Sequence, residues 1–232
     1  PDIAVIEAVA ITEDGGIIPT TSVGNSASFA IFAEKVIVEI NTNLSPAFEG
    51  LHDIYIPSYR PTRQPIPLTE IDERIGTQAI NIDPSNIVGI VINSEFHDSP
   101  STVTEPDDET QGIANHLIAF FEKEVAEDRL PKNLGPLQAG IGSIANAVLT
   151  GLKDSNFEDL IMYSEVLQDC TFELIDAGKM KFASGSSITL SAKYGEKVFN
   201  NLEAYKDKLV LRPQEISNHP ELVRRLGIIG IN

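Results

Sequence analysis

The sequence predicts an α/β fold built from open, mostly parallel sheets with helices on their faces. Short β-branched and apolar runs recur along the chain, helical patterns separate them in the carboxyl-terminal part, and glycine and proline turns fall between them. Strands that alternate with helices are typical of parallel sheets covered by helices. The chain has 232 residues, of which 42% are apolar, so it is long enough to bury a sizeable core.

The amino-terminal part predicts strands joined by a tight reversal. Residues 3–11 form a β-branched run, and the acidic, glycine-containing turn at 12–16 leads into a second strand at 17–19. Residues 22–33 contain small side chains and two phenylalanines, which predict a short helix, and residues 35–40 predict a third strand. We therefore expect a small sheet at the start of the chain.

A proline-dense stretch follows these strands. It predicts an extended crossing segment, because each proline removes a backbone donor and opposes regular structure. Its prolines alternate with two arginines, in the order Pro57, Arg60, Pro61, Arg63, Pro65 and Pro67. Residues 87–92 then predict a buried strand, and the polar segment 99–108 predicts a domain boundary. The expected domains are 1–99 and 100–232.

Beyond this boundary, apolar residues first follow the spacing of one helical face. They are Ile113, Leu117, Phe120, Phe121 and Val125. Asp107 or Asp108 is placed to cap this helix. A glycine-rich turn followed by a helix is predicted at 140–152. Further helices are predicted at 167–177, 194–205 and 220–226, and strands at 160–164, 188–190, 208–211 and 228–231.

The charge of the chain excludes two classes of partner. Its 17 basic and 34 acidic residues give a formal net charge of −17, and such a surface repels nucleic-acid backbones and anionic lipid. No apolar run reaches the roughly 18 residues that a membrane span needs. We therefore expect neither nucleic acid nor a membrane as a partner.

Cysteine and histidine give no sign of a disulfide framework or a metal site. The single cysteine, Cys170, fits a reducing compartment, and we expect it to pack as a small buried residue. The histidines, His52, His97, His116 and His219, lack metal-ligand spacing. They are expected at the surface or in hydrogen-bonded positions, and no metal is predicted.

A glycine turn is the first candidate site. Residues 140–145 read Gly-Ile-Gly-Ser-Ile-Ala before a helix, so backbone N–H groups there could approach a phosphate or a developing oxyanion. A plain helix-entry turn is the alternative. Dinucleotide binding requires an apolar strand directly before the first glycine, and residues 133–138 do not read as one, so nicotinamide binding is a distant alternative.

Glu165 is the second candidate. It follows the predicted strand 160–164, and the carboxyl ends of strands form the ligand-binding edge of open α/β sheets. The alternative is that Glu165 compensates a helix dipole. Residues 184–187 are predicted to form a turn before a strand and lack the G-x-S-x-G frame of a hydrolase elbow.

Short motifs spread in order along the chain resemble one family. They are residues 24–26 (GNS), 48–54 (FEGLHDI), 63–65 (RQP), 72–76 (DERIG), 113–117 (IANHL), 136–148 (PLQAGIGSIANAV), 164–169 (SEVLQD) and 217–227 (SNHPELVRRLG). Together they resemble the acetyl-CoA hydrolase/transferase group of class I CoA-transferases. That group includes succinyl-CoA:acetate CoA-transferases and fungal mitochondrial acetyl-CoA hydrolases.

The resemblance implies roles for the candidate residues. Glu165 matches the family's nucleophilic glutamate, which attacks an acyl-CoA thioester and forms first an acyl-glutamyl anhydride and then a glutamyl-CoA thioester. Asn218 matches an asparagine beside that thioester. The family's CoA-contacting loop, whose donors hold the pantetheine or stabilise a tetrahedral oxyanion, is matched by Gly140, Ile141, Gly142, Ser143 and Ile144.

The predicted function is CoA transfer between short acyl-CoAs (acetyl-, propionyl- or succinyl-CoA) and acetate or another short carboxylate. CoA is then a substrate, and no permanently bound cofactor is expected. An acetyl-CoA hydrolase is the alternative within the enzymes. A noncatalytic acidic binding module or an inactive fragment is the alternative from another class.

The resemblance also implies parts of two CoA-transferase domains. Residues 1–99 would be the carboxyl-terminal part of the first, and residues 100–232 the amino-terminal part of the second, which carries the nucleophile. Both chain ends lie in apolar runs, so we expect an internal piece of a longer protein. Its expected partners are the missing parts of its own chain and a second copy in a homodimer. The fungal likeness implies a mitochondrial location, with the cytoplasm as the alternative.

Overall fold

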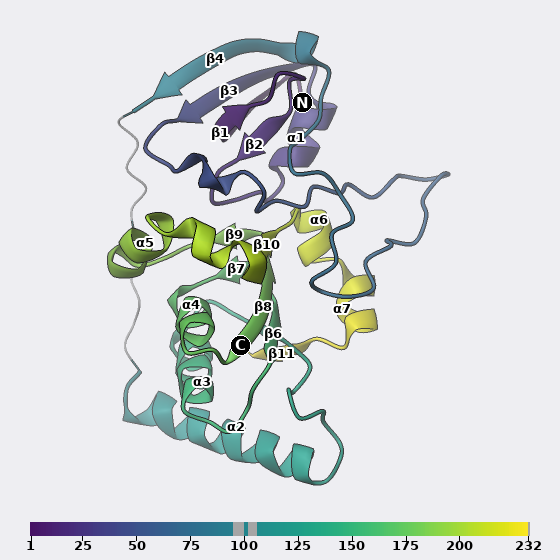
Figure 1. The fold of residues 1–232 in the computed structure, drawn as a ribbon. Helices are drawn as coiled ribbons and strands as arrows, with labels where there is room; N and C mark the ends of the chain where they lie inside the picture. Colours follow the sequence, from purple (N-terminus) through teal and green to yellow (C-terminus); the bar gives the residue numbers. More distant parts are fainter. Residues whose placement is uncertain (95–99, 102–105, 232) are drawn as a thin grey trace.

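The computed structural model describes residues 1–94, 100–101 and 106–231. It contains a four-stranded sheet in the first half of the chain and a five-stranded sheet in the second half (Figure 1). Half of the predicted boundary at 99–108 lies outside the described residues, namely 99 and 102–105, and so does His97. The predicted α/β class with mostly parallel sheets is confirmed.

The first sheet has the strand order β2-β1-β3-β4. Its strands are β1 (Ile3–Ile11), β2 (Ile17–Pro19), β3 (Lys35–Asn41) and β4 (Ile87–Asn93). β2 runs antiparallel to β1, whereas β3 is parallel to both β1 and β4. Helix α1 (Ser26–Phe32) is shorter than the predicted 22–33. It packs against β1 through small buried residues, Ala27 and Ala30.

One face of this sheet is only partly covered within the described residues. Along β1, Ala4 and Ile6 are buried, while Ile3 and Val5 are 55% and 63% exposed. β4 was expected to be buried, and that expectation is wrong, because Ile90 and Ile92 are 58% and 66% exposed. Among the described residues, β4 pairs with β3 and lies at the edge of the sheet, so an apolar run was not sufficient evidence of burial.

The second sheet is parallel throughout and has the order β10-β8-β6-β5-β11. Its strands are β5 (Pro136–Ala139), β6 (Leu160–Tyr163), β8 (Met180–Gly185), β10 (Leu209–Leu211) and β11 (Ile229–Ile231). A separate parallel pair joins β7 (Val166–Leu167) to β9 (Ser187–Ile188). This pair directly follows the ends of β6 and β8.

The helices of the second half flank its sheet (Figure 1). They are α2 (Asp108–Ala126), α3 (Ser143–Lys153), α4 (Asp169–Asp176), α5 (Ala192–Phe199), α6 (Gln214–Ser217) and α7 (Pro220–Leu226). Asp107 caps α2 by accepting from the Thr110 N–H at 2.8 Å. The predicted helix 194–205 divides into α5 and a 3₁₀ segment, η3 (Leu202–Lys208). Two further 3₁₀ turns are η1 (Pro46–Phe48) and η2 (Pro84–Asn86).

Two strands of the second sheet were missed. β8 reads MKFASG, whose small and polar residues hide a strand that is almost fully buried. Residues 184–187 are therefore not simply a turn, because Ser184 and Gly185 end β8. β5 lies directly before the glycine turn, so the objection that no strand precedes Gly140 is also wrong. Its neighbours β6 and β11 satisfy its backbone groups despite Pro136.

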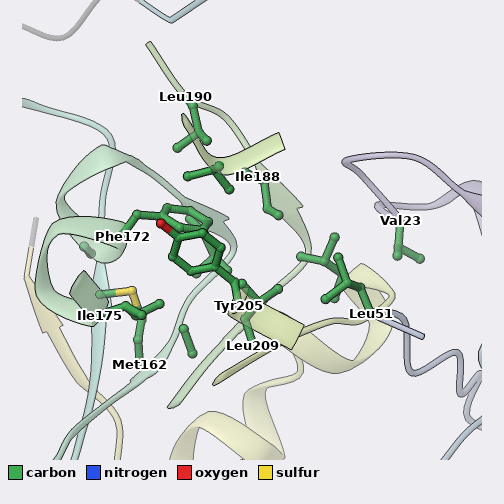
Figure 2. Packing of buried hydrophobic residues seen from close by; sticks show 14 of the residues in the cluster. Val23, Leu51, Met162, Phe172, Ile175, Ile188, Leu190, Tyr205 and Leu209 are labelled. Atoms are coloured by element: carbon green, nitrogen blue, oxygen red, sulfur yellow. The ribbon is translucent and has the colours of Figure 1, made fainter. Parts of the chain in front are cut away.

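Both faces of the second sheet are buried. Leu209 and Leu211 of β10 join the large core cluster, whereas Val210 between them joins a smaller cluster on the opposite face, as the period of two in a strand requires. Figure 2 shows the large cluster, to which Val23 and Leu51 of the first half belong together with Leu209 of the second half. The two halves of the chain thus share one apolar core.

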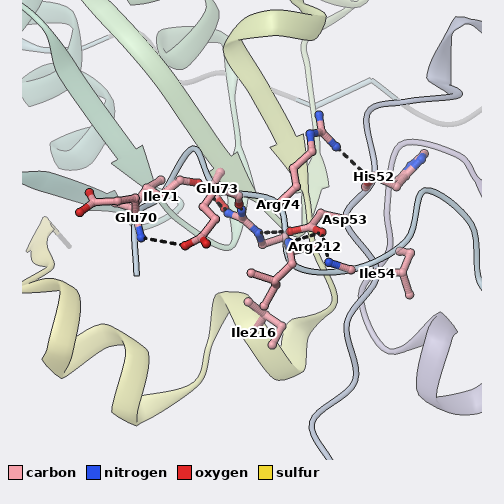
Figure 3. A network of polar contacts seen from close by, with 12 residues as sticks. His52, Asp53, Ile54, Glu70, Ile71, Glu73, Arg74, Arg212 and Ile216 are labelled. Carbon is pink, nitrogen blue, oxygen red and sulfur yellow. Dashed lines mark hydrogen bonds and ion pairs between the residues drawn. The ribbon is translucent and has the colours of Figure 1, made fainter. Parts of the chain in front are cut away.

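A buried ion pair also joins the halves. Arg212, at the end of β10, is 0% exposed and donates from Nε to Asp53 Oδ2 at 3.0 Å. Its Nη1 donates to Ile71 O at 3.0 Å and to Ser184 Oγ at 2.6 Å, and its Nη2 donates to Glu73 O. Figure 3 shows this network, which fixes the point where β10 leads into α6.

Candidate active site

Glu165 lies at the carboxyl-terminal edge of the second sheet. It follows Ser164 after β6, as expected, and its side chain is exposed. Within the part of the chain that the structure describes, it forms no ion pair. The carboxylate is therefore free to contact a ligand.

Two neutral amide groups hold this carboxylate. Gln214 Nε2 donates to Glu165 Oε1 at 2.8 Å, and Asn218 Nδ2 donates to Glu165 Oε2 at 3.0 Å. Ser217 Oγ donates to Asn218 Oδ1 at 2.8 Å, which turns the amide NH₂ toward Glu165. The carboxylate is thus oriented without a neutralising cation.

The backbone of Glu165 is anchored through the other strands of the site. Its carbonyl accepts from the Ser186 N–H at 2.7 Å and the Ser187 N–H at 3.1 Å. The Gly24 N–H donates to Ser186 Oγ at 3.2 Å, and Gly24 O accepts from the Gln214 N–H at 2.9 Å. A loop of the first half therefore ties the backbone of Glu165 to that of its amide partner.

A hollow of about 250 Å³ opens beside Glu165. Its wall includes Gln138 from β5, Gly230 from β11, and Tyr163, Ser217 and Asn218. Burial raises the pKa of Tyr163 to about 12, and its hydroxyl donates to Ile216 O at 2.6 Å, so the phenol stays protonated. Val223 and Ile228 complete the lining, so a small chamber with both polar and apolar walls lies next to the glutamate.

The glycine turn lies at the same sheet edge, after the neighbouring strand. β5 and β6 pair in parallel, so Gly140 and Glu165 follow adjacent strand ends, and Gln168 Nε2 donates to Gly140 O at 3.3 Å. A separate hollow is formed by the turn itself, residues 140–145, and Ile141 is 77% exposed there. Ser143 begins α3 and Ile144 follows it, so their N–H groups lie at a helix start, where anions are favoured.

Of the predicted site residues, the structure brings Glu165 and Asn218 into direct contact. Gly140, Ile141, Gly142, Ser143 and Ile144 share their sheet edge without a hydrogen bond to the glutamate side chain. Gln214 was missed by the sequence analysis. Its spacing of four from Asn218, one helical turn, was the signal that could have identified it.

Cys170 and His52, which were not expected to react, are both buried. Cys170 is buried, and burial raises the pKa of its thiol to about 12, which opposes a nucleophilic role. His52 is also buried, with Nε2 3.0 Å from Thr20 O, and burial lowers its pKa from 6.5 to about 4. The described residues contain no group of three metal-binding side chains. None of the helices seen in the structure is both long and apolar enough to cross a membrane.

Solved structures with a similar fold include CoA-transferases. RipA from Yersinia pestis superposes with a TM-score of 0.64 at 19% identity, covering 99% of this chain and 44% of that chain. A 4-hydroxybutyrate CoA-transferase from Porphyromonas gingivalis gives a TM-score of 0.63 at 20% identity, covering 100% of this chain and 50% of that chain. The fold is therefore of the CoA-transferase type.

Sequence comparisons identify the family. Residues 1–92 match the family model of the acetyl-CoA hydrolase/transferase N-terminal domain. The chain is 49% identical to an acetyl-CoA hydrolase of Schizosaccharomyces pombe and 48% identical to a succinyl-CoA:acetate CoA-transferase of Clostridium kluyveri. These alignments cover 100% of this chain but 44% and 43% of the relatives, so the chain spans less than half of their length. The expected resemblance is confirmed: over its whole length this chain is similar to proteins named acetyl-CoA hydrolase and succinyl-CoA:acetate CoA-transferase.

Proposed function

We propose that the protein containing this chain transfers CoA between short acyl-CoAs and acetate or another short carboxylate. The observation that carries the proposal is the exposed Glu165 carboxylate, held by the amides of Gln214 and Asn218 at the sheet edge. Relatives named acetyl-CoA hydrolase and succinyl-CoA:acetate CoA-transferase support the class of reaction. Acyl-CoA and carboxylates are the substrates, and CoA is not a resident cofactor.

The chemistry begins with attack of a Glu165 oxygen on the thioester carbonyl. The C–S bond breaks, which gives an acyl-glutamyl anhydride and CoA thiolate. The thiolate then attacks the glutamyl carbonyl, releases the acyl group as a carboxylate, and leaves a glutamyl-CoA thioester. An incoming carboxylate reverses these steps and departs as its CoA ester, so the glutamate is regenerated.

The two amides serve successive states of the glutamate. Before reaction, Gln214 and Asn218 orient the charged carboxylate. After acylation, the same N–H groups can donate to the carbonyl oxygen of the anhydride or the thioester. Donors at the start of α3, in the turn 140–144, would hold the acyl-CoA or stabilise a tetrahedral oxyanion.

The decisive experiment traps the glutamyl thioester in the natural protein. After incubation with acetyl-CoA, borohydride should reduce the adduct on Glu165 to an alcohol that peptide mass spectrometry detects. Glu165→Ala and Glu165→Asp should lose both the adduct and the transferase activity. Glu109→Gln, an exposed acid on α2, is the matched control and should retain both. Full activity in Glu165→Ala would reject the proposal.

The amides are tested separately. A hydrogen bond to a charged group contributes about 1.5–3 kcal/mol, so Gln214→Ala and Asn218→Ala should each lower kcat/KM about 10- to 100-fold. Ser217→Ala should cost less, because it removes only the group that orients Asn218. A wild-type kcat/KM in all three variants would show that the two amides take no part in the reaction.

Hydrolysis is the second candidate, favoured by the relatives named acetyl-CoA hydrolase and by the exposure of Glu165 to water. Product analysis with succinyl-CoA, in the presence and absence of acetate, separates the two. A transferase should form succinate and acetyl-CoA only when acetate is present and release no net free CoA, whereas a hydrolase should release free CoA and succinate whether or not acetate is present. A protein that neither binds CoA nor releases it would instead favour the noncatalytic alternative.

The proposal also includes the expected setting of the enzyme. Residues 1–99 and 100–232 would be parts of two CoA-transferase domains, the protein would form a homodimer, and it would reside in mitochondria, with the cytoplasm as the alternative. Native mass measurement and cell fractionation test the last two points.

A further inference from the structure

The short helix α6 carries one amide partner of Glu165 at each end. Gln214 begins the helix and Asn218 follows its last residue, and both side chains donate to the Glu165 carboxylate. A helix of four residues is far too short to be stable by itself, so tertiary contacts must hold it. The contacts around α6 therefore decide where the two amides lie.

The first half of the chain holds the amino-terminal end of α6. The Gln214 N–H donates to Gly24 O at 2.9 Å. One residue later, Glu215 Oε1 accepts a hydrogen bond from Ser28 Oγ of α1, and this hydrogen bond is the α1–α6 contact. Helix α1 itself packs on β1 through small buried residues. Figure 1 shows α6 on the side of the second half that lies toward α1.

Fold stability alone does not explain the glutamate of this contact. Glu215 Oε2 is buried and has no hydrogen-bond partner among the described residues. The Glu215 carboxylate also forms no ion pair with the part of the chain that the structure describes. A buried polar atom without a partner lowers stability and offsets the hydrogen bond from Ser28. Glu215 is better explained by the position that it gives to α6.

The carboxyl-terminal end of α6 is held by a different part of the chain. Arg63 Nη2, in the proline-dense segment, donates to His219 Nε2 at 2.6 Å, and His219 directly follows Asn218. This hydrogen bond does not involve α1. Loss of the α1–α6 contact should therefore displace Gln214 more than Asn218.

We propose that Ser28 and Glu215 are positioning residues for the nucleophile Glu165. Their hydrogen bond holds the first turn of α6, so that Gln214 Nε2 stays 2.8 Å from Glu165 Oε1. A misplacement of about 1 Å near reacting groups can lower a rate by about 100-fold. This inference rests on the proposed function for the identity of the reaction.

The test measures acetyl-CoA turnover by the natural protein. Ser28→Ala and Glu215→Ala should each lower kcat about fivefold, which is less than the loss of the whole amide, and should leave KM for acetyl-CoA unchanged. Glu215→Gln keeps an oxygen that accepts from Ser28 and should retain most of the wild-type kcat. Ser85→Ala is the matched control, because Ser85 Oγ donates to the exposed Asp83 carboxylate at 2.7 Å; it should leave kcat unchanged.

The melting temperature separates positioning from a merely structural role. Because Glu215 Oε2 has no partner among the described residues, Glu215→Ala should keep Tm within about 2 °C of the wild type while kcat falls. A lower Tm together with a wild-type kcat would overturn the inference. An effect of Ser85→Ala on kcat as large as that of Ser28→Ala would also overturn it.

A double-mutant cycle identifies the amide that the α1–α6 contact serves. In Gln214→Ala, the addition of Ser28→Ala should lower kcat no further, because the positioned group is already missing. In Asn218→Ala, the same addition should still lower kcat about fivefold. An equal further loss in both backgrounds would indicate a purely structural role for Ser28 and reject the positioning of Gln214.

Amide hydrogen exchange keeps this inference distinct from the proposed reaction. The Asn218 N–H donates to Gln214 O at 3.0 Å across α6, so a loosened helix should exchange faster. If Ser28→Ala speeds exchange in residues 213–218 while the wild type turns over no thioester, the contact holds α6 as argued and the proposed function fails. If thioesters turn over through the glutamate but Ser28→Ala changes neither kcat nor exchange, the proposed function stands and the positioning role is rejected.

Discussion

Arg212 allows the sharpest test of how the site is built. Arg212→Met keeps much of the side-chain volume but removes the guanidinium that pairs with Asp53 at 3.0 Å. Asp53 would stay buried at 1% exposure, and the carbonyl groups of Ile71 and Glu73 and the Ser184 hydroxyl would lose their donor. Breaking a fully buried pair costs about 3–5 kcal/mol. For a domain of this size, that lowers Tm by about 10 °C.

Thermal unfolding of the natural protein, followed by circular dichroism, measures this effect. Lys181→Met is the control, because Lys181 and Asp72 form an exposed pair at 4.0 Å, which contributes about 1 kcal/mol or less. Arg212 lies two residues before Gln214, so Arg212→Met should also slow the adduct formation at Glu165. A Tm within about 2 °C of wild type would show that the buried pair does not join the two halves as argued.

The remaining predictions concern stability and reactivity. His52 is buried, and its pKa is lowered to about 4, so as the pH falls the unfolded state binds a proton before the folded state does. The free energy of unfolding should therefore fall by about 3 kcal/mol between pH 6.5 and pH 4. Denaturant titrations of His52→Gln should lack this pH dependence. Gly76→Ala should destabilise the protein strongly, because the added Cβ would lie 2.2 Å from Ile54 O. The Cβ of Gly112→Ala in α2 would meet nothing within 4 Å, so this variant should be stabilised by about 0.5–1 kcal/mol. Equal melting temperatures of the two variants would contradict this steric account. The Cys170 thiol, with its pKa raised to about 12 by burial, should resist iodoacetamide at pH 8 until the protein unfolds, and rapid native labelling would refute its burial.

The sequence predicted the elements whose pattern is strong. The β-branched runs of β1 and β3, the capped helix α2 and the strand before Glu165 all formed where expected. β5 and β8 were missed because a central strand flanked on both sides can contain proline, lysine and serine when its neighbours satisfy its backbone. β4 gave the opposite error, since its apolar run occupies an edge.

By itself, the sequence determined which residues are chemically able to act. Motif resemblance selected Glu165 and Asn218, and the strand pattern placed the glutamate at a sheet edge, because these properties depend on residue type and local spacing. Only the tertiary structure decided that Gln214 is the second amide, that Gly24 anchors it, and that Arg63 meets His219. Arg63 and His219 are 156 positions apart. Such contacts depend on the packing of the two halves around one core, which local periodicity does not encode.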